Sequence, residues 1–516
     1  MPKHAMTPPK LDEPTRRYLE RHRDDCAATP IRWWQTAWYA LWTGAFLYWV
    51  FYRWDVTLAV VNFLFSFWYL SVIAFRSAIV LLAVVKPCEM RFSRAALDTL
   101  DDDSLPFYTL LVPLYREANI ANKIIPRLDA LDYPPDKLDI KLLLEEDDRA
   151  TRDAVARMNL PPRYETIVVP DSLPKTKPKA CNHGLLRARG EYCVIFDAED
   201  RPEPDQLKKA VLAFRLAPPD VACVQAKLNY YNARQNLLTR WFAIEYATTF
   251  DIFLPGLQYA RIPMPLGGTS NHFRTGILRE LDGWDPFNVT EDCDLGVRIY
   301  RAGYRTRMID STTWEEACSR LGGWLRQRSR WVKGFFQTHL VHARNPFRAL
   351  RQLGLRGYLG FLLTVGGSSL MMVLNVLYWI MGGLYLTLAI QAMTRGHGPV
   401  TVLRGPREAL PGSPVWPMLY YGPDQDRLWA TLSVVFFTSA IVLFLANFLF
   451  VAMHALACVK RRMPRFLPWA LLMPFYWILI SAGAWKGFIQ LFTRPFYWEK
   501  TEHGKAREDT HPASEV

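Results

Sequence analysis

The sequence predicts an α/β domain inserted between α-helical membrane segments. Long apolar runs lie toward both ends of the 516-residue chain, whereas residues 103–345 have the charge density of an ordinary soluble domain. Within this central block, short apolar runs alternate with helix-like stretches. Such alternation is typical of a mostly parallel sheet that carries helices on its faces.

Five runs without Asp, Glu, Lys or Arg predict the membrane segments, and a purely soluble protein is thereby excluded. They are residues 33–52, 56–75, 357–394, 428–459 and 466–485. A helix needs about 20 apolar residues to cross a bilayer core. We expect two transmembrane helices in residues 32–86, and three or four in residues 356–495 around a Gly/Pro-rich loop near 396–426. Both five and six crossings remain open, because the third run can hold two short crossings or one span with an interfacial helix.

The two ends of the chain, residues 1–31 and 496–516, are polar and predict loosely ordered tails. The formal net charge of +13 does not indicate a nucleic-acid partner, because no stripe of basic and aromatic residues resembles a nucleic-acid module. Basic residues beside membrane segments are better explained by anchoring on anionic lipid. The eight cysteines form no C-x-x-C pair, so neither a disulfide framework nor a structural zinc site is indicated.

The central block contains five short, β-rich apolar runs and three helix-like stretches. The predicted strands are residues 108–113, 140–144, 166–169, 192–196 and 221–224, and the predicted helices are residues 119–131, 151–158 and 204–216. In sheets of this kind the ligand lies at the carboxyl ends of the strands. The polar residues that follow the strands are therefore the candidates for a site.

Acidic residues follow several of these strands. They comprise Glu117 after the first, Glu145, Glu146, Asp147 and Asp148 after the second, and Asp197, Glu199 and Asp200 after the fourth, with Thr290-Glu291-Asp292 before a later helix. Carboxylates gathered at one edge repel one another unless a cation intervenes. Oxygen ligands of this type favour Mg²⁺ or Mn²⁺, which often share their coordination with substrate phosphates. Solvated loop acids or helix caps are the alternative for any single cluster.

A basic segment, residues 175–182, lies between the third and fourth strands. It carries three lysines, and each can act as a point charge facing a pyrophosphate. A solvated loop is the alternative interpretation. The segment is not a Walker A loop, because the pattern G-x-x-x-x-G-K-[ST] is absent.

Four motifs in this order resemble the family 2 glycosyltransferases, and more narrowly the processive membrane synthases of cellulose, chitin and hyaluronan. They are Pro113-x-Tyr115-x-Glu117, the D-x-D-like pair Asp197 and Glu199, the triplet ending at Asp292, and the Q-x-x-R-W motif at residues 327–331. Residues 496–504 and the variant acidic motifs resemble bacterial curdlan and mixed-linkage β-glucan synthases. The resemblance implies a GT-A-like fold for residues 103–345, with interfacial helices toward its end.

The resemblance also implies a donor site, and a metal ion within it. The donor-side residues would be Tyr115, Glu117, Asp147, Asp148, Lys179, Asp197, Gln327 and Arg330, with Asp147 preferred to Asp148 for the uridine. The metal, Mg²⁺ or Mn²⁺, would be held by Asp197 and Glu199. The third position of D-x-D is Glu in this chain, so Asp200 could replace Glu199 as a ligand.

For the acceptor side, the resemblance implies Asp292 as the general base. Trp284, Asp285, Glu291 and Trp331 would contact the acceptor, with Trp331 offering a flat apolar face to a sugar ring. The paired glycines at 267 and 268 permit close approach of the backbone, and we expect Gly268 to contact the acceptor sugar, with an ordinary turn as the alternative. Trp498, Lys500 and Thr501 resemble a gating segment that closes over the donor pocket. Residues 327–331 also fit a basic amphipathic helix at the lipid surface, and both properties can hold together.

These expectations lead to a processive inverting transferase that polymerises a UDP-sugar, with UDP-glucose preferred, into a secreted β-glucan. The catalytic domain would be cytosolic in a multi-pass protein of the bacterial inner membrane, with export subunits as possible partners. Single-sugar transfer to a lipid carrier is the alternative, as is a β-linked polymer of N-acetylglucosamine or mannose. A catalytically silent scaffold or nucleotide-sugar sensor is the alternative hypothesis in which the protein is not an enzyme.

Overall fold

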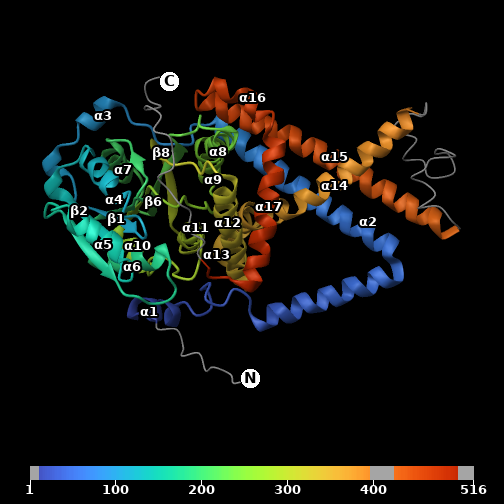
Figure 1. The fold of residues 1–516 in the computed structure, drawn as a ribbon, viewed down its shortest axis with the longest axis horizontal. Coiled ribbons are helices and arrows are strands. Elements are labelled where there is room, and N and C mark those ends of the chain that lie inside the picture. Colours follow the sequence, from blue (N-terminus) through green and yellow to red (C-terminus); the bar gives the residue numbers. More distant parts are fainter. Residues whose placement is uncertain (1–10, 395–422, 498–516) are drawn as a thin grey trace.

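The structure is a computed structural model that describes residues 11–394 and 423–497. Figure 1 shows the α/β domain at one end of the molecule and the long apolar helices at the other. All eight cysteines lie in the described part and are free thiols. The predicted fold class, an α/β domain inserted between apolar helices, is confirmed.

One eight-stranded sheet forms the centre of the domain. Its strands are β1 (Tyr108–Leu114), β2 (Leu138–Glu145), β3 (Tyr164–Val169), β4 (Tyr192–Ile195), β5 (Arg201–Pro202), β6 (Val221–Tyr230), β7 (Asn271–Arg274) and β8 (Arg305–Glu315). The spatial order is β3-β2-β1-β4-β7-β6-β8-β5. Strands β3, β2, β1 and β4 pair in parallel, as do β6 and β8, but β7 is antiparallel to both of its neighbours and β5 to β8. The expectation of a mostly parallel sheet is therefore corrected to a mixed sheet.

Helices cover both faces of the sheet, which explains why the strands are continuous apolar runs. One face packs against α4 (Ala121–Asp129), α5 (Arg149–Ala156) and α7 (Gln206–Leu216). The other packs against α6 (Lys177–Arg187), α9 (Leu254–Tyr259), α10 (Thr275–Glu280) and α11 (Glu291–Arg301). Short elements complete the domain: α3 (Arg94–Asp98), η1 (Asp102–Ser104) and η2 (Pro135–Lys137).

The N-terminal segment is ordered where it is described, contrary to the expected loose tail. Helix α1 (Glu13–Arg21) begins after Asp12, whose side chain accepts a hydrogen bond from the backbone N–H of Thr15. Tyr18 on this helix is buried. Figure 1 shows α1 lying under the α/β domain near α6.

Three helical segments in the described residues are long and apolar enough to cross a membrane: Trp33–Val85, Pro346–Thr387 and Thr438–Lys460. A bent pair, Pro464–Ala470 with Met473–Thr493, would make a fourth. The first segment, α2 (Trp33–Val85), has non-helical backbone at Arg53, where Figure 1 shows the chain folding back on itself. The two helices expected in residues 32–86 thus appear as two arms that meet at Arg53. The expected Gly/Pro-rich loop lies almost wholly outside the described residues.

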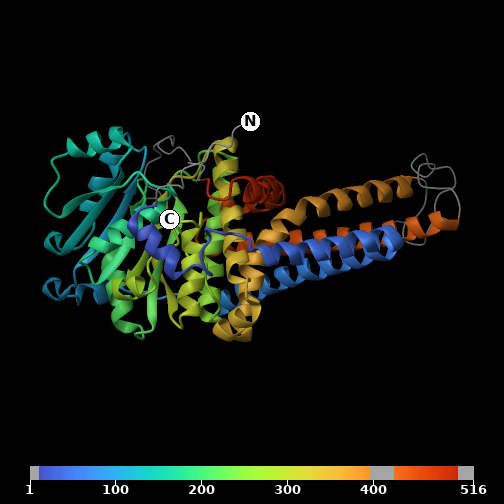
Figure 2. The same cartoon turned by 90° about the horizontal axis from the view of Figure 1, so that it is seen from below.

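The remaining apolar helices pack against the domain and against one another. They are α13 (Pro346–Phe361), η4 (Leu362–Gly366), α14 (Gly367–Thr394), α15 (Pro423–Lys460), η6 (Pro464–Phe466), α16 (Leu467–Ala470) and α17 (Met473–Thr493). Figure 2 shows α2, α14 and α15 running together away from the α/β domain. Between domain and membrane helices lie α8 (Leu237–Ala247), the π-helical turn η3 (Thr248–Phe253) and α12 (Leu321–His342).

Close packing joins α12 to α17, the last of the apolar helices. A Cβ at Gly487 of α17 would lie 2.5 Å from the carbonyl oxygen of Ser329 on α12. A side chain at this position would therefore push the two helices apart. Since α12 carries the Q-x-x-R-W motif, the apolar helix α17 helps to fix the position of that motif.

Candidate active site

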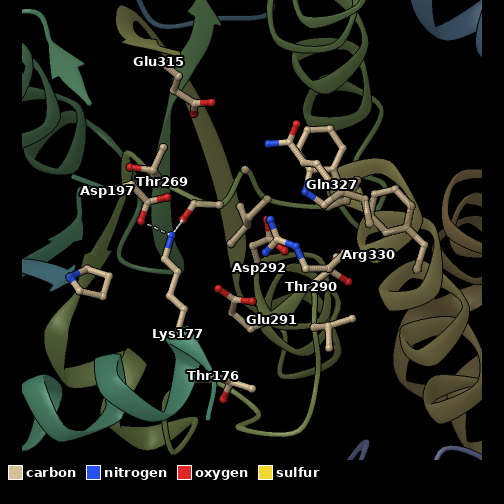
Figure 3. Close-up of a pocket in the computed structure, with 18 of the residues that line it drawn as sticks. Thr176, Lys177, Asp197, Thr269, Thr290, Glu291, Asp292, Glu315, Gln327 and Arg330 are labelled. Carbon is tan, nitrogen blue, oxygen red and sulfur yellow. Dashed lines mark hydrogen bonds and ion pairs between the residues drawn. The ribbon is translucent and has the colours of Figure 1, made fainter. Parts of the chain in front are cut away.

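A cavity of about 1560 Å³ opens at the carboxyl edge of the sheet. The loops that follow β1, β3 and β4 line one side of it, and α12 and the first turn of α11 line the other. Arg76 of α2 and Ser368 of α14 also line it, so the cavity extends from the sheet edge to the long apolar helices. Figure 3 shows Asp197, Lys177, Glu291, Asp292 and Arg330 around its centre.

The predicted base, Asp292, lies in this cavity in the first turn of α11. Its Oδ1 accepts a hydrogen bond from the backbone N–H of Cys293 at 2.8 Å. A Cβ at Gly268 would lie 3.5 Å from its Oδ2, so the predicted acceptor glycine sits directly beside the predicted base. Burial raises the pKa of Asp292 to about 6, although the Cys293 N–H and the charge of Lys177 oppose the rise. The carboxyl group is therefore poised to change its protonation near neutral pH.

Glu291, the neighbour of Asp292, also lines the cavity and is buried. Burial and the charge of Asp292 raise its pKa to about 7, against the opposing charge of Lys177. The two adjacent carboxyl groups thus make an acidic wall. Arg330 of α12 faces this wall in Figure 3.

Lys177, which the sequence analysis did not single out, is the lysine at the centre of the cavity. Its Nζ lies 2.6 Å from Oδ1 of Asp197 and donates a hydrogen bond to the carbonyl of Gly268 at 2.7 Å. Burial alone would lower the pKa of Lys177, but the charges of Asp197 and Glu291 raise it. The lysine is therefore a firmly held cation between the donor-side and acceptor-side loops.

Lys179, the lysine predicted to face the diphosphate, is only 1% exposed. Its Nζ lies 3.1 Å from Oε2 of Glu145 and donates to the carbonyls of Pro170 and Ser172. All three contacts hold the loop that follows β3. The structure thus places Lys177 in the cavity and Lys179 behind it.

The acidic residues after β4 divide into two that face the cavity and one that does not. Asp197 and Glu199 line the cavity, whereas Asp200 is fully buried. The Oδ2 atom of Asp200 accepts hydrogen bonds from the backbone N–H of Asp197 at 2.7 Å and from the Thr269 hydroxyl. These bonds fix the loop that presents Asp197.

The chemistry of these residues fits a divalent cation. Burial and the charges of Asp197 and Glu199 raise the pKa of Asp200, whose Oδ1 is buried without a hydrogen-bond partner. Burial and the charge of Asp200 likewise raise the pKa of Glu315, which lines the same cavity. Among residues 11–394 and 423–497, no three His, Cys, Asp or Glu side chains could enclose a metal ion by themselves. A cation here would therefore need donor phosphates to complete its coordination.

The predicted nucleoside side is formed by the loops after β1 and β2. Tyr115 and Glu117 line the cavity. Asp147 is exposed and does not line it, although its Oδ2 lies 3.5 Å from the Tyr115 hydroxyl and also pairs with Lys175. Asp148 is buried, accepts a hydrogen bond from the backbone N–H of Arg116 and caps α5. Asp148 therefore shapes the Tyr115 loop from behind.

The Q-x-x-R-W motif on α12 presents Gln327, Arg330 and Trp331 to the cavity. Arg328 also reaches it, but its guanidinium forms a two-pronged ion pair with Glu245 of α8. Its Nη2 donates a further hydrogen bond to the Tyr476 hydroxyl at 3.0 Å. The guanidinium also lies 4.9 Å from the ring centroid of Trp331, so Arg328 holds that ring in place.

Two predicted acceptor residues do not reach the cavity. Trp284 is fully buried in the core beside Phe273, and Asp285 is fully buried against the N-terminal segment. Glu291, Gly268 and Trp331, the other three, do line it. The predicted gating residues Trp498, Lys500 and Thr501 lie outside the described residues.

Comparison with known proteins identifies the central region. Residues 192–395 match the family described as "Glycosyl transferase family group 2". The chain is 29% identical over 238 residues to probable glycosyltransferase YdaM of Bacillus subtilis (strain 168), covering 45% of this chain and 55% of that protein. It is 27% identical over 250 residues to glucomannan 4-beta-mannosyltransferase 2 of Arabidopsis thaliana, covering 46% of each. The chain thus spans about half the length of the relatives it matches.

A similar solved structure is the mannosyltransferase PcManGT from Pyrobaculum calidifontis in complex with GDP-Man and Mn²⁺. It is 19% identical, with a TM-score of 0.45, and the match covers 74% of this chain and 98% of that one. The family match contains Asp197, Asp292, Gln327, Arg330 and Trp331, all of which line the cavity. Residues 192–395 are therefore similar to the family 2 glycosyltransferases over the part of the chain that contains the cavity residues of α11 and α12.

Proposed function

We propose that the chain is a processive, inverting hexosyltransferase that builds a β-linked glucan from a nucleotide sugar and passes it across the membrane. UDP-glucose is the donor that the resemblance to bacterial β-glucan synthases implies. The observation that carries the proposal is the cavity itself, which joins Asp197 and Asp292 at the sheet edge to Ser368 among the apolar helices. One cavity would thus contain the donor site, the base and a path for the product toward the membrane.

In this mechanism Asp292 removes the proton from the acceptor hydroxyl as that oxygen attacks the anomeric carbon. The new glycosidic C–O bond forms as the bond from the anomeric carbon to the phosphate oxygen breaks, and the electron pair leaves with the diphosphate. A carboxylate of raised pKa is a suitable base, because it remains ionised at neutral pH and yet accepts a proton readily. Attack from the face opposite the leaving group inverts the anomeric centre.

The departing diphosphate would be stabilised by fixed cations. Lys177 and Arg330 line the cavity on opposite sides of Asp292 and Glu291. Charges held in place before the reaction are worth more than mobile ones, since they need no reorganisation. Asp197 and Glu199 would hold Mg²⁺ or Mn²⁺, which supplies positive charge to the diphosphate oxygens when it is bound.

Transfer to a growing polymer is supported by the part of the cavity that reaches the membrane helices. Trp331 offers an aromatic face, and the polar groups Glu245, Arg328 and Ser368 follow toward the membrane side. Aromatic faces and paired polar groups suit the two surfaces of a pyranose ring. Transfer of one sugar to a lipid carrier would need less of this space. The catalytic domain would lie in the cytosol, as in a protein of the bacterial inner membrane.

A second candidate donor carries mannose. Several relatives are glucomannan 4-beta-mannosyltransferases, and one of them matches nearly half of this chain. The product would then be a β-mannan or glucomannan, made with the same base and the same fixed cations.

The test is a donor panel. The full chain in lipid nanodiscs is given UDP-glucose, UDP-N-acetylglucosamine, GDP-mannose and GDP-glucose, and the products are sized and analysed for linkage. The proposal expects a long, lipid-free β-glucan from UDP-glucose. A long mannan from GDP-mannose would replace the donor but keep the polymerase. A single sugar on extracted lipid would overturn processive synthesis, and no product from any donor would overturn the function.

A further inference from the structure

We propose that the N-terminal segment, residues 11–29, is a strap that positions the two catalytic loops relative to each other. Asp285 binds the strap to the loop before the base, and it is a positioning residue that does not itself touch substrate. The inference rests on the proposed function only in taking Asp292 as the base. It assigns a role to a segment that lies outside the region of family similarity, which begins at residue 192.

The strap is held at one end beside the donor-side loop. Oδ2 of Asp12 accepts hydrogen bonds from the Ser172 hydroxyl at 2.9 Å and lies 3.0 Å from Nε2 of His183 on α6. Asp12 also caps α1, so the same carboxylate fixes the helix and its attachment. Ser172 and His183 flank Lys177 in sequence, and the strap therefore borders the segment that presents this lysine.

At its other end the strap is held by the loop that leads to the base. Oδ2 of Asp285 accepts a hydrogen bond from the backbone N–H of Ala27 at 2.6 Å. Oδ1 accepts one from the Cys26 thiol at 3.3 Å and one from the backbone N–H of Phe287 at 2.9 Å. One fully buried carboxylate thus ties the strap to the loop that ends at Asp292. Because a buried carboxylate is costly without donors, these bonds strongly favour the docked strap.

The strap is also fastened to α12, the helix of the Q-x-x-R-W motif. Just beyond α12, the guanidinium of Arg344 donates hydrogen bonds to the backbone carbonyls of Asp24, Cys26 and Thr29. Arg344 is itself buried, so these carbonyls are its anchoring partners within the fold. The strap consequently connects the donor-side loop, the base loop and the motif helix.

The two catalytic loops also meet directly under the strap. The Thr176 hydroxyl, next to Lys177, donates a hydrogen bond to the carbonyl of Pro286 at 2.8 Å. This contact lies between the two ends at which the strap is held. Leu11, Leu19 and Ala28 of the strap line the cavity with Phe287, so the strap forms part of the wall. Its apolar side chains, Tyr18 among them, also pack with Val341 of α12 and with Phe496.

Small errors in the placement of reacting groups are costly, because a misplacement of about 1 Å can lower a rate about 100-fold. If the strap positions the loops, loosening one end should affect the reaction in a way specific to that end. Release at Asp285 should disturb the base, and release at Asp12 should disturb the donor side. A segment that merely adds stability would change neither selectively.

The experiment compares Asp285→Asn and Asp12→Asn in the full chain, with Glu13→Gln as the matched control. Glu13 lies next to Asp12 on α1, but its side chain is 67% exposed, and its ion pairs within residues 11–394 and 423–497 are with Arg16 and Arg17 of the same helix. Two readouts are used: hydrogen exchange of the loops, which needs no turnover, and steady-state kinetics with the donor that the panel identifies. Thermal unfolding of each variant shows that it is folded.

For Asp285→Asn we expect faster hydrogen exchange in residues 286–292 and a kcat lowered about 10-fold or more, with the donor KM changed less than about 2-fold. For Asp12→Asn we expect faster exchange in residues 172–177 and a donor KM raised several-fold. Glu13→Gln should match the wild type in both readouts. If Asp285→Asn does not fold, Asp12→Asn carries the test alone.

The strap is overturned if both loops exchange as in the control and the kinetics are unchanged. It is equally overturned if a variant lowers the unfolding temperature without a loop-specific change in exchange. If the wild type transfers no sugar but the two variants still show their loop-specific changes in hydrogen exchange, the proposed function is overturned and the strap remains.

Discussion

The ammonium of Lys177 lies 2.6 Å from Oδ1 of Asp197, and this pair marks the centre of the cavity. Lys177 begins α6 and Asp197 follows β4, the next element along the chain, so the start of the helix and the end of the strand meet at one edge of the sheet. The same Nζ reaches the carbonyl of Gly268, beside the base. The lysine therefore links the donor-side acid to the acceptor side.

Substitution of Lys177 should lower activity, whereas substitution of Lys179 should lower stability. Lys177→Gln should lower kcat/KM for the donor about 100-fold or more, because a fixed cation opposite the leaving group is lost. Its unfolding temperature should stay close to that of the wild type. Lys179→Met should instead destabilise the fold by about 3 to 5 kcal/mol, since it leaves the buried Glu145 carboxylate without its cation.

Donor kinetics and thermal unfolding of both variants check this pair. Equal losses of activity with equal stability would mean that both lysines serve the donor, as the family resemblance implied for Lys179. Loss of activity only in Lys179→Met would reverse the assignment.

The rate should fall on the acid side of about pH 6. The pKa of Asp292 is raised from its ordinary value of 3.8 to about 6, so the carboxylate is present above that pH and is lost as the pH falls through it. We expect kcat/KM to decrease about 10-fold per pH unit below about pH 6. A pH–rate profile of the wild type measures this limb.

Glu291→Gln is the control for that limb, because Glu291 has a pKa raised to about 7 in the same wall. The variant should retain an acid limb near pH 6. If the fall in kcat/KM at acid pH disappears in Glu291→Gln, the titrating group is Glu291. If the rate of the wild type falls only near pH 4, the pKa of the base is not raised.

Chelation of divalent cations should stop sugar transfer, and Mg²⁺ or Mn²⁺ should restore it. Asp197→Asn should raise the concentration of metal that gives half the maximal rate, because Asp197 faces the cavity. Asp200→Asn should mainly lower stability, since Asp200 is fully buried and holds the loop through Thr269. Activity that persists in EDTA would refute the metal site.

Gly334→Ala should disturb the triplet that carries the base. A Cβ at Gly334 of α12 would lie 2.2 Å from Oγ1 of Thr290, so α12 and the triplet must separate. We expect a loss of about 1 to 3 kcal/mol in stability and a clear loss of kcat.

Gly322→Ala on the same helix is the matched control, because the nearest atom to its Cβ would be Nη1 of Arg326 at 3.9 Å. It should leave both quantities unchanged. Thermal unfolding and single-turnover rates of the two variants are the measurements, and full activity in Gly334→Ala would show that the triplet tolerates displacement.

The sequence predicted the parallel part of the sheet because β1, β2, β3 and β4 are apolar runs separated by helical patterns. It did not predict β7, which spans only four residues and carries the polar pair Asn271 and His272. Both side chains are buried, and β7 completes the sheet between β4 and β6. Nothing local marks such a strand, since its neighbours supply its hydrogen bonds.

The sequence predicted the cavity residues best where a motif specifies a position. It predicted them worst where the register of a helix determines which side chain faces the cavity. Asp292 and Trp331 were predicted from family motifs and Gly268 from its paired glycines, and all three line the cavity. Lys177 was missed in favour of Lys179, although two residues along a helix turn a side chain by about 200° to the opposite face. Only the start of α6 at Lys177 decides which lysine faces the site.

The N-terminal segment contains a local helix signal, although its polar composition favoured a loosely ordered tail. Asp12, Glu13 and Pro14 form a helix-start pattern, with Asp as the cap and Pro in the first turn. The polar composition nevertheless favoured a loose tail. Docking depends on partners more than 150 residues away, such as Ser172 and Asp285, and no local pattern can reveal them.

The most direct test of the central claim is turnover and donor binding in Asp292→Asn. We expect turnover to fall about 1000-fold or more, since the variant cannot accept the acceptor proton, while donor affinity measured by calorimetry stays within about 2-fold of the wild type. Turnover close to that of the wild type would contradict Asp292 as the base and with it the proposed mechanism.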